Sequence, residues 1–172
     1  DAPSELLAGT VLLVVLVRAP LVSPMIALQS YLTVSFRDAP GAAWRRAGVV
    51  GGALLVVTAL LAAAAAIWAT PLVTAVVPRY VLPSPWVLSA IVVGAGLVGV
   101  QTVTGALVLS RSLHRAYATG WVATALLTVA LSFVPLDFGA AVALCLTVPG
   151  VIGCAIHILA GRTSRAGEAQ HL

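Results

Sequence analysis

A single arginine stands inside the first long apolar run of the sequence, and it is the residue best placed to do chemistry. Arg18 follows Glu5 by thirteen residues, in a stretch dominated by Leu and Val. At 1.5 Å per residue, about 20 Å of helix would separate the two. In a bilayer a charge at that depth costs about 2.5 kcal/mol or more unless it meets water or a partner. We therefore expect Arg18 to line a cavity; the alternative is snorkelling to the outer headgroups.

Two amides could act together with this arginine. Gln29 follows Arg18 by eleven residues, or three helical turns, so both lie on one helix face. Gln101, with Thr104 nearby, forms a second polar patch in a later apolar run. A lone amide within a membrane is as often a contact between helices as a substrate contact, and for Gln101 the helix contact is favoured. The candidate substrate-binding residues are Arg18, Gln29 and Gln101.

The other reactive residues indicate neither catalysis nor metal binding. Cys145 and Cys154 are nine residues apart on one predicted helix, so they point in opposite directions and cannot share a disulfide or a metal. His157 lies one turn after Cys154, but two ligands do not make a metal site. The sequence lacks a pair of buried carboxylates, an HExxH motif and a Ser/His/Asp set. We expect no enzymatic activity, no metal and no cofactor.

The segment from Gly94 to Gly99 matches the dinucleotide fingerprint GxGxxG letter for letter. That fingerprint binds pyrophosphate only between a strand and the start of a helix. Here it lies inside an apolar run, which favours close helix packing through small residues. The same interpretation suits Gly48 and Gly52.

The elements that position these residues follow from composition. Of 172 residues, 61% are hydrophobic and 8% charged, and the mean hydropathy is +1.12; soluble domains have roughly 45–50% apolar and 25% charged residues. The apolar runs are too long for barrel strands and do not alternate with polar residues. The sequence predicts an all-α integral membrane bundle within residues 1–161, with five transmembrane helices at 5–36, 47–69, 86–110, 117–134 and 138–160.

Two prolines interrupt the first predicted helix. Pro20 and Pro24 each remove a backbone donor and disfavour helix in the preceding residue, so a kink is expected there. Broken helices in lipid border cavities, which fits the expectation for Arg18. Trp44 is expected at headgroup level and Tyr117 at the start of the fourth helix; Trp121 is either a headgroup-level or a packing residue.

The arginines predict the orientation. Seven lie in two links and the tail (Arg37, Arg45, Arg46, Arg111, Arg115, Arg162 and Arg165), and the opposite side has Arg79 alone. Cytoplasmic loops retain positive charge, so residues 162–172 are predicted to form a cytoplasmic tail and Asp1 to lie outside. This topology accounts for the net charge of +4 without a nucleic-acid partner. An outside start without Met or a signal pattern indicates the C-terminal part of a larger protein; a processed or trimmed small protein is the alternative.

The first predicted helix resembles the helix that opens the later part of the second lobe in polysaccharide and lipid-linked oligosaccharide flippases, whose superfamily also holds the multidrug and toxin extruders. The resemblance rests on Arg18-Ala19-Pro20, the following Gln29 and the link Phe36-Arg37-Asp38. Later landmarks fall in the same order: Pro78-Arg79-Tyr80, the basic link from Ser110 to Arg115, and Gly139-Ala140-Ala141. Leu32-Thr33-Val34 lacks the family's proline, and Pro78 replaces its usual glycine.

The resemblance implies the last five of about twelve or more helices of a flippase in the bacterial inner membrane, working by alternating access. Its partners would be a lipid-linked oligosaccharide or polysaccharide precursor, membrane lipids and the missing N-terminal lobe. Arg18 would bind a diphosphate or an acidic sugar. One alternative is a multidrug or cation extruder of the same superfamily, which would be expected to carry an acidic residue within its spans. The other is a small, non-transporting membrane scaffold.

Overall fold

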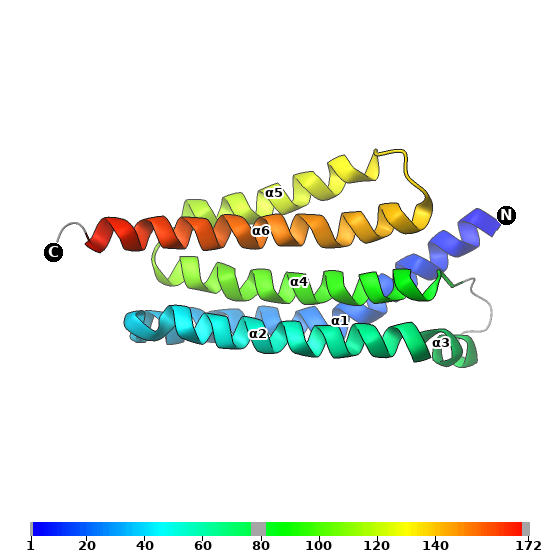
Figure 1. The fold of residues 1–172 in the computed structure, drawn as a ribbon, viewed down its shortest axis with the longest axis horizontal. Helices are drawn as coiled ribbons and strands as arrows, with labels where there is room; N and C mark the ends of the chain where they lie inside the picture. The colour runs from blue at the N-terminus through cyan, green and yellow to red at the C-terminus, as the bar shows by residue number, and fades with distance from the viewer. Residues whose placement is uncertain (1, 77–81, 170–172) are drawn as a thin grey trace.

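The structure, a computed structural model, describes residues 2–76 and 82–169, and within these ranges every regular element is a helix. The elements are α1 (Ala2–Asp38), α2 (Pro40–Ala64), the π-helix η1 (Ala65–Ala69), α3 (Thr70–Val76), α4 (Pro85–Ser110), α5 (His114–Ser132) and α6 (Phe138–Ala169). α2, η1 and α3 follow one another without a break, so they form one continuous helix, and the described residues form five such helices. α3 turns away from the axis of α2 at the end of this helix (Figure 1). The prediction of an all-α bundle is confirmed.

The apolar helices make this a multi-pass membrane protein. In the part of the chain that the structure describes, four helices are long and apolar enough to cross a bilayer: Ser4–Asp38, Pro40–Ala75, Pro85–Ser110 and Phe138–Thr163. The fifth helix, α5, has 19 residues and begins with His114 and Arg115, which makes it shorter and more polar. It corresponds to the fourth predicted span, and Tyr117 lies within it instead of starting it.

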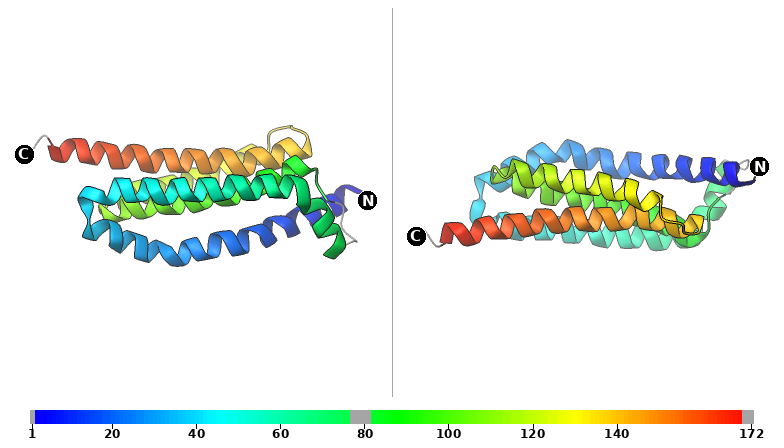
Figure 2. Two further views of the ribbon diagram at one scale, coloured as in Figure 1. Left: turned by 60° about the horizontal axis from the view of Figure 1, so that its bottom comes forward. Right: turned by 90° about the horizontal axis from the view of Figure 1, so that it is seen from above.

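The predicted kink takes the form of a bend in one unbroken helix. α1 runs through Pro20 and Pro24 without interruption, and its rod is visibly curved (Figure 2). Each proline ring clashes with the carbonyl one turn earlier, which pushes the helix axis away at that side. The two halves of α1 therefore approach the bundle at different angles.

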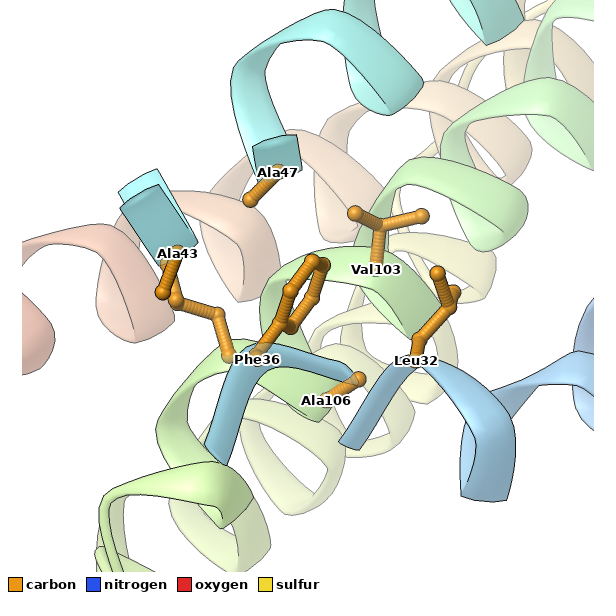
Figure 3. Close-up of a cluster of buried hydrophobic side chains, with 7 residues drawn as sticks. Leu32, Phe36, Ala43, Ala47, Val103 and Ala106 are labelled. Carbon is orange, nitrogen blue, oxygen red and sulfur yellow. The ribbon is translucent and has the colours of Figure 1, made fainter. Parts of the chain in front are cut away.

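α4 is the centre of the bundle. It packs against α1, α2 and α6, while α5 packs mainly on α6. One buried cluster joins α1, α2 and α4 (Figure 3): Leu32, Phe36, Ala43, Ala47, Val103, Ala106 and Leu107. A second joins α1 to the first turns of α4: Leu13, Val87, Leu88 and Ile91. Helices in lipid associate through this kind of close side-chain packing, since lipid tails are as apolar as the helix surfaces.

Small residues allow α4 to lie close to its neighbours. A Cβ added at Gly94 would lie 2.9 Å from the carbonyl oxygen of Leu146 in α6, and one added at Gly96 would meet the side chain of Thr58 in α2. Packing is therefore the role of these glycines, as predicted. The same prediction is wrong for Gly48 and Gly52, because both are exposed and nothing lies within 4 Å of an added Cβ.

The arginines gather at one end of the bundle. The α1–α2 link, the α4–α5 link and the C-terminal part of α6 lie together there (Figure 1). We call this the arginine-rich end; the arginines described on it are Arg37, Arg45, Arg46, Arg111, Arg115 and Arg162. Residues 162–169 continue α6 as helix. Arg79, Tyr80 and the side chain of Arg165 lie outside the described residues.

Candidate functional site

Arg18 lies on an exposed face of α1. Its side chain is exposed, and among the residues that the structure describes it has no hydrogen-bond or ion-pair partner. The preceding residue, Val17, packs in the cluster formed by Leu13, Leu88 and Ile91. Ile91 is six residues into α4, or about 9 Å from its start, so Arg18 lies in the half of the bundle opposite the arginine-rich end. This depth of Arg18, about 9 Å from the start of α4, is smaller than the 20 Å counted along α1 from Glu5.

The face that carries Arg18 continues down α1 to Gln29. Spacings of four, seven and eleven residues place Val22, Met25 and Gln29 below Arg18 on one stripe. Met25 approaches α4, where its Cγ would lie 3.5 Å from a Cβ added at Gly99. Gln29 is half-buried, and its Nε2 donates a 3.0 Å hydrogen bond to the hydroxyl of Tyr117 in α5. The helix is continuous between Arg18 and Gln29, so their spacing places both on one stripe. The Arg18 end of this stripe is exposed, whereas Met25 and Gln29 pack toward α4 and α5.

Gln101 lies elsewhere, in the interior of the bundle. It is fully buried, and its Nε2 donates to the Thr124 hydroxyl at 2.9 Å and to the Gly120 carbonyl at 3.4 Å. Its Oε1 is buried without a hydrogen-bond partner. In this structure Gln101 forms a contact between α4 and α5, the interpretation favoured from the sequence.

Gln101 belongs to a buried polar cluster that we call the polar core, formed by Gln101, Thr104, Tyr117, Thr124 and His157. His157 of α6 is fully buried, with Nδ1 3.1 Å from the Thr104 hydroxyl and Nε2 3.2 Å from the carbonyl oxygen of Tyr117. A carbonyl only accepts, so Nε2 carries a proton and donates it to Tyr117. The Thr104 hydroxyl has one proton and lies 3.1 Å from both His157 Nδ1 and the Gln101 carbonyl oxygen. The His157 ring of α6 is thus held by partners from α4 and α5.

Aromatic and small residues complete the polar core. The Tyr117 ring stacks on His157 with 6.0 Å between ring centroids and 4° between the planes. Gly120 lies directly against the His157 ring, and Gly153 against Gln101 and Thr124, at positions where an added Cβ would collide. A side chain at either position would displace the polar core, so these glycines set how closely α4, α5 and α6 approach.

The sequence alone did not identify His157 as part of any cluster. Its partners come from other helices, 53 residues away for Thr104 and 40 for Tyr117. The available signal was an ionisable residue within an apolar run, four residues after Gly153. Trp121 is a packing residue, with its indole nitrogen buried and its ring edge-on to Tyr117 at 6.3 Å.

Two comparisons gave no match: no protein-family description fits this chain, and no solved structure is similar to it. The chain is similar to mycobacterial proteins. The uncharacterized protein Rv1510 of Mycobacterium tuberculosis is 31% identical over 156 residues, which are 88% of this chain and 35% of the relative. The uncharacterized protein Rv3630 of the same organism is 28% identical over 154 residues, which are 87% of this chain and 35% of the relative. The chain therefore spans about a third of the length of these relatives.

Proposed function

We propose that this chain is the C-terminal part of a flippase that moves lipid-linked oligosaccharide or polysaccharide precursors across the bacterial inner membrane by alternating access. The observation that supports this proposal is the position of Arg18, which is exposed on an apolar helix and has no hydrogen-bond or ion-pair partner among the described residues. A guanidinium binds phosphate through two parallel hydrogen bonds, and the interaction gains strength where water is scarce. A diphosphate-linked glycan would supply the missing anion.

The proposed orientation follows from the arginine-rich end. Six described arginines and the C-terminal part of α6 lie there, which favours a cytoplasmic location for that end. Arg18 would then lie in the outer half of the membrane. The relatives extend well beyond this chain, which leaves room for an opposing lobe across from the Arg18 face. Rocking of two lobes about a central cavity would expose that face to each side in turn.

The acidic residues do not favour the extruder alternative. Glu5, Asp38 and Asp137 lie at helix ends, and no Asp or Glu occupies the middle of a described span. Proton- or sodium-coupled extrusion would need an acidic residue from the rest of a larger protein.

The test uses Arg18→Ala and Arg18→Lys in the full-length protein, in cells that lack the native copy. We expect loss of glycan export with Arg18→Ala and partial export with Arg18→Lys, because lysine keeps the charge but not the two-pronged geometry. Arg37→Ala, an exposed arginine at the end of the same helix, is the matched control and should export normally. Unchanged export by Arg18→Ala, at equal amounts in the membrane, would remove Arg18 from the path.

A second measurement separates a water-filled path from snorkelling into lipid. Arg18→Cys and Leu16→Cys are placed in a background without Cys145 and Cys154, the two free cysteines. Leu16 is 57% exposed and lies 200° around α1 at almost the same depth. A membrane-impermeant thiol reagent should label Arg18→Cys faster than Leu16→Cys. Equal protection of both would contradict an aqueous path and favour the scaffold alternative.

A further inference from the structure

We infer that the groove between α1 and α2 at the arginine-rich end binds the headgroup of an anionic phospholipid, with an acyl chain lying along α2. This inference does not depend on glycan transport. It rests on the groove's charge, on the order of its lining residues along the membrane normal, and on the exposed face of α2 that continues from it.

The headgroup end of the groove is built from Ser35 of α1 and two arginines of α2. The groove has a volume of about 320 Å³. Arg46 Nη1 donates to the Ser35 carbonyl at 3.1 Å and to the Ser35 hydroxyl at 3.3 Å, which holds its guanidinium against α1. A guanidinium has five donors, so this one keeps several for a ligand. Arg45 lines the same groove, and neither arginine has an acidic partner among the described residues.

Apart from Leu32 and Phe36, which are buried, the lining changes from polar to apolar toward the middle of the membrane. The α1–α2 link lies at Ala39; Ser35 is four residues from it, and Arg45 and Arg46 are six and seven. Val49 and Val50 line the groove ten and eleven residues from the link, about 6 Å deeper than the arginines. A phospholipid has the same order, with a charged headgroup at the membrane surface and apolar chains below it.

The floor of the groove is apolar and buried. Leu32 and Phe36 line it and belong to the buried cluster that joins α1 and α2 to α4, with exposed fractions of 8% and 2% (Figure 3). The exposed apolar lining is Tyr31 and Val49. Phosphate alone would gain nothing from these side chains, whereas the glycerol and upper acyl carbons of a lipid would cover them.

An exposed apolar stripe continues from the groove along α2. Val49, Val56 and Leu60 lie on one face by their spacing of seven and four residues, with exposed fractions of 67%, 61% and 67%. The stripe extends over eleven residues, or about 16 Å, which is the length of most of an acyl chain. Basic grooves between transmembrane helices at a charged leaflet are typical headgroup sites. We therefore assign the groove to a lipid and not to a soluble anion or a protein segment.

The test is native mass spectrometry of the full-length protein in detergent, with added phosphatidylglycerol or phosphatidylcholine of identical acyl chains. Wild type should retain phosphatidylglycerol in preference to phosphatidylcholine. Arg45→Gln/Arg46→Gln should retain it about 25-fold less, since a basic residue near an anionic surface contributes about fivefold in affinity. Arg115→Gln/Arg162→Gln is the matched control, because it removes two exposed arginines from the same end outside the groove, and it should bind as wild type.

Three results would overturn the assignment. Equal losses in the two double variants would show a diffuse charge effect and no site. Equal retention of the two lipids would show that the arginines do not select the headgroup. Displacement of the lipid by sn-glycerol phosphate at equal concentration would show a soluble-anion site without acyl recognition. Size-exclusion profiles matching wild type establish that both double variants are folded.

Discussion

Gln29 and Tyr117 are 88 residues apart in the chain, yet the Gln29 amide donates a 3.0 Å hydrogen bond to the Tyr117 hydroxyl. This bond joins α1, the helix that carries Arg18, to α5, with which α1 otherwise shares few contacts. Because Tyr117 also stacks on His157, the same residue connects the Arg18 face to the polar core. Tyr117 thus contacts both.

Tyr117→Phe removes this hydrogen bond and leaves the stacked ring in place. The backbone carbonyl that binds His157 is also unchanged. We expect a double-mutant cycle with Gln29→Leu to give a coupling energy of about 0.6 kcal/mol and no more than about 1.7 kcal/mol, as found between transmembrane helices. The free energy of unfolding of the full-length protein in mixed micelles measures it. Tyr31→Phe, at an exposed tyrosine, is the control; a coupling of zero would show that the bond contributes nothing to stability.

Thr104→Val tests how much the Thr104 hydroxyl contributes to the stability of the polar core. The change keeps the shape of the side chain but removes the hydroxyl that lies 3.1 Å from both the buried Nδ1 of His157 and the Gln101 carbonyl oxygen. The loss of unfolding free energy should be about 1–3 kcal/mol. Thr119→Val, at an exposed threonine whose hydroxyl bonds only its own helix, should change it by less than about 0.5 kcal/mol. Equal effects of the two variants would contradict a stabilising role of the Thr104 hydroxyl in the polar core.

Gly120→Ala should destabilise the bundle, because the new methyl group would occupy the space of the His157 ring. Overpacking of this kind costs about 1–3 kcal/mol. Adding His157→Ala should recover part of that loss, since the ring is what the methyl meets. Thermal unfolding followed by circular dichroism compares the single and double variants. Strictly additive losses would show that the two positions are not in contact.

The two groups of glycines should respond oppositely to alanine. Gly94→Ala places a methyl group against the backbone of Leu146, which cannot move aside without shifting α6. A loss of about 1–3 kcal/mol is expected. Gly52→Ala meets nothing and should leave stability unchanged or raise it by up to about 1 kcal/mol through helix propensity. Destabilisation by Gly52→Ala in the full-length protein would indicate that another part of the protein covers this face of α2.

The sequence by itself determined the fold class and which segments share an end. Backbone groups in lipid must find their partners within the segment, so apolar runs of this length form helices whatever they pack against. The order of those helices then places Arg37, Arg45, Arg111 and Arg162 at one end, because successive helices run in opposite directions. The spacing of Arg18 and Gln29 also predicts that they share a helix face, because three turns of a continuous helix separate them.

Only the tertiary structure decided which helix faces are inside. A helix that is apolar all round has no contrast between its faces, so its sequence does not indicate the side that meets a neighbour. For this reason the sequence did not indicate that Gly51 of α2 is buried while Gly48 and Gly52 are exposed. The contacts of His157 with Thr104 and Tyr117 were likewise not predictable from the sequence. Both partners come from other helices, and the contacts depend on how those helices are rotated about their axes.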